Sequence, residues 1–315
     1  MNKLGKNILL ASFVSILFAT AFIGNTSADE ALFGRTSLTD TLPKRKWEAV
    51  QMYSGKYGDF HNRYANSLYQ TGIQYGMTDR LQEAVYLNYR HVYANRNERN
   101  GTTGGANVPE NASTSKPFNH LLFDSVSSES IYRVSSPYLN PVGIALYLKP
   151  TFGRDTIAIA PKLILQKNFL EDRLVWGFNL NWVLAWDRET GGAILPGSGR
   201  TKRRWRRHAD LEASTGIIYR FAPRWWAGVE LFHDMSMESF NPADIGNLAF
   251  FAGPTIHYSS QRFWITTNVL FQLPIGVPIS RESKNETEGD SGKIGRILGD
   301  QHQKIEAQLK MGYQF

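Results

Sequence analysis

Charged, amide and aromatic side chains recur at every second position in several segments of this chain. Tyr147 and Lys149 are two residues apart, and so are Asp210 and Glu212. Residues two apart share one face of a β-strand, so each pair would present its side chains to one surface. Cationic groups there could hold an anion, rings could stack, and amides could donate hydrogen bonds. The candidate residues for such a surface are Tyr86, Arg90, Arg133, Tyr147, Lys149, Lys162, Asn179, Asn181, Asp210, Glu212, Glu230 and Lys310.

Alternation of apolar and polar residues, bounded by turn residues, predicts the strands that would position these side chains. The expected ranges are 47–54, 64–76, 81–94, 127–136, 142–152, 156–168, 173–188, 207–221, 224–236, 247–258, 262–274 and 303–315. We therefore expect an all-β fold of twelve strands, with ten or fourteen as alternatives. Pro161 and Pro254 fall inside expected strands, where a missing N–H donor suggests β-bulges.

One face of these strands is continuously apolar. Leu180 and its neighbours two residues away on segment 173–188 are Leu, Trp or Phe, whereas Asn181 belongs to the polar face. The last strand alternates in the same way and ends on the aromatic Phe315. An Arg or Lys on the lipid side at mid-depth would cost about 2–4 kcal/mol, so the polar face belongs inside. The pattern predicts a closed antiparallel transmembrane β-barrel, with a mean hydropathy of −0.34 because only every second residue is apolar. A soluble β-sandwich is the competing fold.

The N-terminus has the layout of a cleaved signal peptide. Lys3 and Lys6 precede an apolar run over residues 8–23, and small residues follow up to Ala28. A permanent membrane helix is the weaker alternative, since the run is shorter than about 20 residues. We expect a signal peptide over residues 1–28, a periplasmic segment over 29–46 and the barrel over 47–315. The chain has no cysteine, which excludes disulfides and thiolate metal sites.

The connections between expected strands alternate between short and long. Barrels of this class have short periplasmic turns and long extracellular loops, so twelve strands place both termini in the periplasm of an outer-membrane protein. The longest early connection, residues 95–126, contains Leu121, Leu122 and Phe123, which need burial. We expect this loop to fold into the barrel mouth, with packing against the rim as the alternative.

The densest basic run would then lie outside the cell. It contains Lys202, Arg203, Arg204, Arg206 and Arg207. Guanidinium groups pair well with phosphate, so we expect this run to bind lipopolysaccharide phosphate, with a solvated rim as the alternative. Nucleic acid is not an expected partner despite the formal charge of +7, because an exported protein meets the outer leaflet first.

Several segments carry a family resemblance. Residues 39–48, 75–82, 132–137 and 161–167 resemble putative outer-membrane transporters encoded beside meta-pathway phenol degradation in Gram-negative bacteria. The ending also resembles the assembly signal of outer-membrane barrels, which implies the barrel-assembly machinery as a partner. The residues that match this signal are Leu309, Met311, Tyr313 and Phe315.

A passive channel or transporter for a small anionic or aromatic solute is the function we expect. A structural or lipopolysaccharide-interacting barrel with a filled lumen is the alternative. A lipid hydrolase is a remote alternative, because His257 and Ser259 resemble the His-x-Ser pair of such enzymes, but Ser259 begins a short turn and no Asn follows. No metal-ligand cluster, nucleophile elbow or phosphate loop occurs in the sequence, so we expect no catalytic residues, metal or cofactor.

Overall fold

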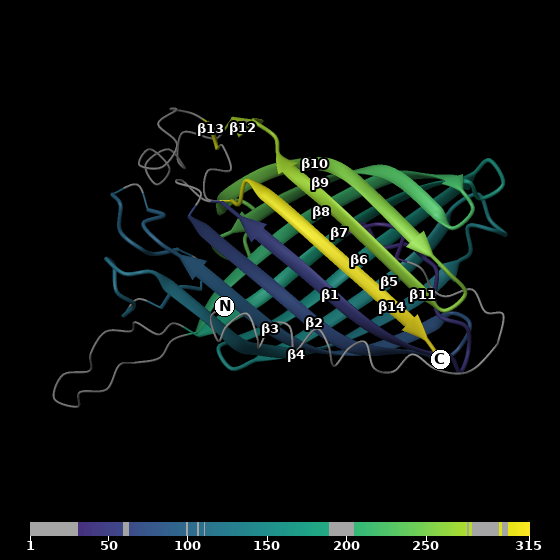
Figure 1. Ribbon diagram of the computed structural model, residues 1–315, viewed down its shortest axis with the longest axis horizontal. Coiled ribbons are helices and arrows are strands. Elements are labelled where there is room, and N and C mark those ends of the chain that lie inside the picture. Colours follow the sequence, from purple (N-terminus) through teal and green to yellow (C-terminus); the bar gives the residue numbers. More distant parts are fainter. Residues whose placement is uncertain are drawn as a thin grey trace, which may run out of the picture.

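Twelve strands pair edge to edge into one closed antiparallel barrel (Figure 1). The computed structural model describes residues 31–58, 63–98, 100–105, 107–109, 111–188, 205–275, 277–278, 296–297 and 302–315. The barrel strands are β1 (Trp47–Tyr57), β2 (Tyr64–Gly76), β3 (Leu81–Ala94), β4 (Phe118–Ser135), β5 (Gly143–Gly153), β6 (Thr156–Phe169), β7 (Leu174–Arg188), β8 (Trp205–Ala222), β9 (Trp225–Met237), β10 (Ile245–Ser259), β11 (Phe263–Gln272) and β14 (Ile305–Gln314). The short strands β12 (Val277–Pro278) and β13 (Arg296–Ile297) form a separate pair. The predicted fold class and strand number are confirmed.

The last strand closes the barrel. β14 lies between β1 and β11, and Leu309 is opposite both Tyr53 and Thr267. Closure gives each strand two hydrogen-bonded neighbours, so the barrel has no free edge. None of the described residues forms a helix long and apolar enough to cross a membrane. The expected signal peptide, residues 1–28, lies outside the described residues.

The two faces of the wall follow the predicted alternation. On β7, Leu180 faces outward with 42% of its surface exposed, whereas Asn181 faces inward and is buried. On β14, Glu306 and Gln308 are buried inside, and Phe315 just beyond the strand is 60% exposed. The residues of the expected assembly signal, Leu309, Met311, Tyr313 and Phe315, therefore share the outer, apolar face.

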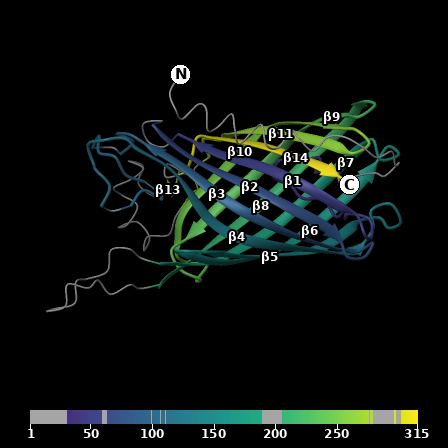
Figure 2. The ribbon, with the colours of Figure 1, turned by 60° about the horizontal axis from the view of Figure 1, so that its bottom comes forward.

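Short and long connections lie at opposite ends of the barrel. Residues 77–80, 136–142, 170–173, 223–224 and 260–262 connect strands at the end where β14 finishes, which we call the turn end. The opposite, loop end carries the longest connections, together with shorter ones over residues 58–63, 154–155 and 238–244. Figure 2 shows the connection from β3 to β4 on the side away from the C-terminus.

β4 differs from its expected range and begins at Phe118 instead of residue 127. Its register against β3 shifts at Asp124, because Asn88 is opposite Ser125 whereas Tyr89 is opposite Phe123. A bulge adds one residue and reverses the alternation, which is why the periodic pattern ended too early. The expectation that residues 118–123 fold into the barrel mouth was therefore wrong, since they extend the wall.

The bulges expected at the two prolines were also wrong. Pro161 is opposite Leu148 and Pro254 is opposite Val229, each in continuous register. On its other side each proline interrupts the pairing: Pro161 has no partner on β7, and Pro254 has none on β11. In both cases the pairing resumes in the same register beyond the proline. The wall tolerates a proline because a strand in a barrel keeps its other neighbour as a hydrogen-bonding partner.

Candidate functional site

The N-terminal segment over residues 31–42, called the plug segment below, lies inside the barrel near the turn end (Figure 1). The sequence predicts a periplasmic segment over residues 29–46, and the part of this range called the plug segment contacts inward-facing side chains of the wall. Phe33 and Leu42 are fully buried against the inner wall. The segment has no strand alternation, so only contacts with the closed wall define its position.

Glu230 on β9 is the main anchor of the plug segment. Its carboxylate accepts hydrogen bonds from the backbone N–H groups of Gly34, Arg35 and Thr36 at 2.9, 2.8 and 3.0 Å. The amide of Asn268 donates a fourth hydrogen bond at 2.9 Å. Successive backbone N–H groups form a concave site for an anion, here filled by the carboxylate of the wall. Glu230 therefore holds the segment in place and is not free to contact a solute.

Inward-facing amides continue the attachment along the wall. The backbone N–H of Ser37 donates to Asn179 at 2.7 Å, that of Thr39 to Gln166 at 2.8 Å, and that of Leu42 to Gln82 at 2.7 Å. These bonds satisfy backbone groups that have no strand partner inside the lumen. The plug segment is thus fixed from β3 across to β9.

Two inward glycines make room for this segment. A Cβ at Gly216 would lie 2.6 Å from the ring of Phe33, and one at Gly177 would lie 2.9 Å from Thr36. Phe33 packs in a buried cluster with Ile218 and other apolar side chains. Small residues at these wall positions are required because the plug segment approaches the strands so closely.

Arg35 extends from the plug segment to Glu306 on β14. Its Nε and Nη2 atoms donate to the two carboxylate oxygens at 3.1 and 3.0 Å, and the Glu306 side chain is fully buried. Burial alone would lower the pKa of Arg35, but nearby carboxylates, Glu306 first, raise that pKa overall. The guanidinium therefore stays charged and balances a carboxylate that water does not reach.

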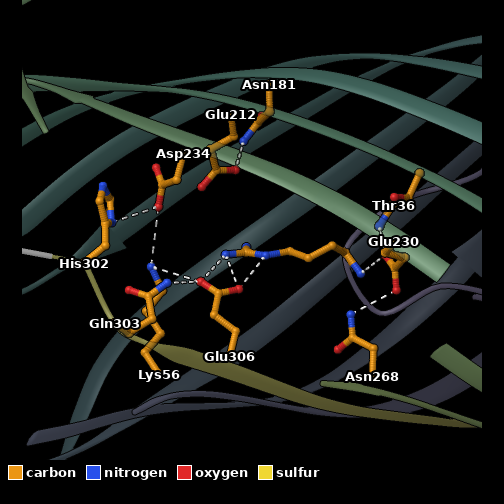
Figure 3. Close-up of polar contacts among 11 residues, drawn as sticks. Thr36, Lys56, Asn181, Glu212, Glu230, Asp234, Asn268, His302, Gln303 and Glu306 are labelled. Carbon is orange, nitrogen blue, oxygen red and sulfur yellow. Dashed lines mark hydrogen bonds and ion pairs between the residues drawn. The ribbon is translucent and has the colours of Figure 1, made fainter. Parts of the chain in front are cut away.

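A wider network surrounds this pair (Figure 3). Lys56 lies 3.8 Å from Glu306 and 3.9 Å from Asp234, and His302 lies 3.7 Å from Asp234. Burial lowers the pKa of His302, and the Asp234 carboxylate opposes that shift. The network joins β1, β9 and β14 and fills this side of the lumen.

Arg133 lies at the turn end, where the chain enters the lumen. Its guanidinium is 4.0 Å from the carboxylate of Asp40. Burial raises the pKa of Asp40, while the amide of Gln166 and the guanidinium of Arg133 oppose the shift. Arg133 thus faces inward as expected, but contacts the plug segment and borders a separate small pocket.

A central cavity of about 400 Å³ occupies the lumen beyond the plug segment, toward the loop end. Its polar walls come from β1, β2, β3 and β5 to β8, and Arg35 reaches it from the plug segment. Seven of the expected residues line it, namely Arg90, Tyr147, Lys149, Lys162, Asn181, Asp210 and Glu212. Ligand pockets in proteins are typically about 300–1,000 Å³, so the cavity is large enough for a small solute.

The other expected residues face inward but do not border this cavity. Asn179 and Glu230 bind the plug segment, and Lys310 is inward on β14. Tyr86 is buried in a cluster with Ala31 packed against it, and the Lys149 ammonium lies 5.2 Å from its ring centroid. The expected residues share the inward face, but the sequence alone does not separate the residues that hold the plug segment from those that border open space.

Three charged or amide residues that line the cavity were not expected from the sequence, namely Arg35, Lys56 and Asn66. Lys56 and Asn66 share the inward parity of their strands, so extending the first strand beyond residue 54 would have found Lys56. No periodic signal marks Arg35, because the plug segment is not a strand.

The basic run is only partly within the described residues, since Lys202, Arg203 and Arg204 lie outside them. Arg206 faces the inner side of the rim and forms a salt bridge with Glu238. Arg207 is opposite the outward residue Trp186. The two described arginines thus point to opposite sides of the wall, and Arg206 is already paired with a carboxylate.

His257 and Ser259, on β10, face the interior of the barrel and are both buried. The His257 Nδ1 atom lies 2.7 Å from the Thr266 hydroxyl. A lipid hydrolase site would need access from the lipid side, which this orientation does not provide. Within the described part of the chain, no group of three or more His, Cys, Asp or Glu residues could hold a metal ion.

Residues 25–315 match a family of unknown function, DUF6662. The chain belongs to this family. A comparison with curated proteins found no match.

Several solved structures of outer-membrane proteins are similar to this chain over most of its length. An outer-membrane channel of Pseudomonas putida F1, COG4313, is 11% identical, with a TM-score of 0.50 over 88% of this chain and 98% of the channel. The β domain of the Bordetella autotransporter BrkA is 10% identical, with a TM-score of 0.49 over 86% of this chain and 100% of that domain. The NanC porin is 9% identical, with a TM-score of 0.43 over 84% and 97% of the two chains. At these identities the likeness is one of fold.

Proposed function

We propose that this protein is an outer-membrane channel that lets a small solute cross passively. The observation that carries the proposal is the central cavity, which has charged and polar walls inside a barrel with an apolar outer face. The charged side chains that line this cavity would be unfavourable in an empty space, so water or a solute must occupy the cavity. The fold likeness to an outer-membrane channel supports the same function.

The solute that we propose is small and anionic or aromatic. The Lys162 ammonium lies 4.1 Å from the ring centroid of Tyr147, so a cation and a ring occupy one wall. The resemblance to transporters encoded beside phenol degradation points to the same class of solute. Both termini would be periplasmic, because the short connections gather at the end where β14 finishes.

Planar-bilayer recordings of the purified protein test this function. We expect discrete conductance steps and a reversal potential in a salt gradient that indicates modest anion preference. Lys162→Glu should reduce that preference, because it reverses a charge in the cavity wall. Lys167→Glu is the matched control, since Lys167 faces outward on the same strand, and it should leave the selectivity unchanged.

A filled structural barrel is the second candidate function. The plug segment supports it, because its contacts with Glu230 and Glu306 occupy part of the lumen. A complete absence of conductance, both in the intact protein and after removal of residues 31–42, would favour this candidate over the channel.

Assembly provides a further prediction, since we propose that the outward face of β14 is read by the barrel-assembly machinery. Phe315→Ala should lower the folded yield in the outer membrane several-fold and leave a protease-sensitive periplasmic form. Ile305→Ala is the control, because Ile305 is exposed on the same face at the other end of the strand. Equal yields of the two variants would contradict a signal at the C-terminus.

A further inference from the structure

The charges that line the central cavity are separated into two walls. Lys149 on β5 and Lys162 on β6 form a cationic wall, and Asp210 and Glu212 on β8 form an acidic wall. Lys162 is opposite Asn181 on β7, and Asn181 is opposite Glu212. Neighbouring strands are about 4.8 Å apart, so the backbones of Lys162 and Glu212 are about 10 Å apart.

Among the described residues, neither lysine of the cationic wall forms an ion pair within 4.0 Å, although the carboxylates of Glu129 and Glu212 act on both at longer range. The Lys162 ammonium donates to the Ser37 hydroxyl at 3.2 Å, and the Lys149 ammonium lies over the ring of Tyr86. Of the carboxylates nearby, Glu129 acts on both lysines without forming an ion pair, and Asp124 has a cationic partner of its own. Glu129 accepts a hydrogen bond from the Tyr147 hydroxyl at 2.8 Å, and Asp124 pairs with Arg90 at 2.5 Å.

In the part of the chain that the structure describes, Asp210 and Glu212 also form no ion pair within 4.0 Å, although Arg35 and the two lysines act on Glu212 and His208 acts on Asp210 at longer range. Glu212 accepts a hydrogen bond from the neutral amide of Asn181 at 2.8 Å. Arg35 and Lys56 also line the cavity, but each forms an ion pair with Glu306. A buried charge without a partner is costly, so each wall favours a group of the opposite sign.

The surface between Lys149 and Asp210 is small and apolar, beside the polar Asn181 that separates Lys162 from Glu212. Lys149 is opposite Ala160 and Asp210 is opposite Val183, and both apolar residues line the cavity with Ala158. A solute that spans the walls would therefore place an apolar group against these side chains. An anionic solute could pair with the lysines, but only a solute that also carries a cationic group would pair with the acidic wall as well.

We infer that the central cavity binds a small zwitterion of the amino-acid type that carries an apolar side chain. Its carboxylate lies at Lys149 and Lys162, its ammonium lies at Asp210 and Glu212, and its side chain packs on the apolar strip between them. This inference names the solute of the channel proposed above, but binding at equilibrium does not require that the channel conduct.

Isothermal titration calorimetry on the detergent-solubilised protein tests the inference with three probes that share one skeleton. L-phenylalanine carries both charges, 3-phenylpropionate only the carboxylate, and 2-phenylethylamine only the ammonium. We expect L-phenylalanine to bind at least about tenfold more tightly than either analogue, which corresponds to about 1.4 kcal/mol. Equal binding of L-phenylalanine and 3-phenylpropionate, or no binding of any probe, would overturn the inference.

Single substitutions assign the two ends of the ligand. Lys162→Met should weaken L-phenylalanine and 3-phenylpropionate together, by about tenfold or more. Glu212→Gln should weaken L-phenylalanine but not 3-phenylpropionate. Lys167→Met, on the outer face of β6, is the control for loss of a lysine and should change neither. If the protein conducts but does not show this binding pattern, the zwitterion inference is wrong and the channel proposal stands. If it binds as expected but does not conduct, only the channel proposal is wrong.

Discussion

Glu230→Gln is expected to release the plug segment from the wall and to raise its open population by about thirtyfold. Glu230 accepts three backbone hydrogen bonds from this segment, and a hydrogen bond to a charged group contributes about 1.5–3 kcal/mol. Glutamine keeps the size of the side chain but loses the charge. A net loss of about 2 kcal/mol corresponds to about a thirtyfold change in an equilibrium constant.

Two measurements can detect the release of the plug segment. Single-channel recordings should show more frequent and larger openings. Because the native chain has no cysteine, Ser37→Cys introduces a single thiol, and a periplasmic thiol reagent should label it faster when Glu230→Gln is also present. Ser37 is held by Asn179 in the intact protein, so labelling reports its departure from the wall.

Glu129→Gln is the matched control for this experiment. It makes the same change on an inward carboxylate that binds Tyr147 and has no described contact with the plug segment. It should leave the thiol labelling rate unchanged. Equal labelling of Ser37→Cys with and without Glu230→Gln would show that the remaining contacts, not Glu230, hold the segment.

Arg35→Met is expected to lower the free energy of unfolding by about 3–5 kcal/mol. The substitution leaves the fully buried Glu306 carboxylate without its bidentate partner, and breaking a buried pair by removing one member costs about this much. Lys56, 3.8 Å away, compensates only in part because it also lies near Asp234. Urea unfolding of the protein in lipid vesicles measures the change.

The double variant Arg35→Met with Glu306→Met separates charge from packing. Removing both charges eliminates the unpaired carboxylate, so most of the loss should be recovered. If the losses of the two single variants simply add in the double variant, the pair is not coupled, and the instability of Arg35→Met would come from packing of the plug segment alone.

Alternation along the chain was enough to predict the wall of this barrel. Alternation along a strand is a local property with a period of two, so residues such as Leu180 and Asn181 reveal their faces without knowledge of any partner. The requirement that charges avoid lipid then assigned Lys149, Lys162 and Glu212 to the interior, and the structure places all three there. The interior could thus be predicted as a set of residues.

The strand prediction was wrong in two places, where a bulge interrupts the two-residue alternation and where a proline lies within a strand. The extra residue at Asp124 reversed the alternation of β4, and its first half was therefore interpreted as a loop. Pro161 lacks a donor, yet its strand continues in register because one of its two neighbours still pairs with it. Both differences depend on strand pairing, which a single strand does not encode.

The contacts of each interior residue depend on how the closed barrel brings distant segments together. The plug segment has no periodic pattern, and its contacts join residues far apart in the chain, such as Arg35 and Glu306 at a separation of 271 residues. Glu230 and Glu212 share the inward parity, but one holds the plug segment and the other lines the central cavity. The difference arises because closing the barrel sets the distances across the lumen, and those distances determine which charges pair with the protein and which remain for a solute.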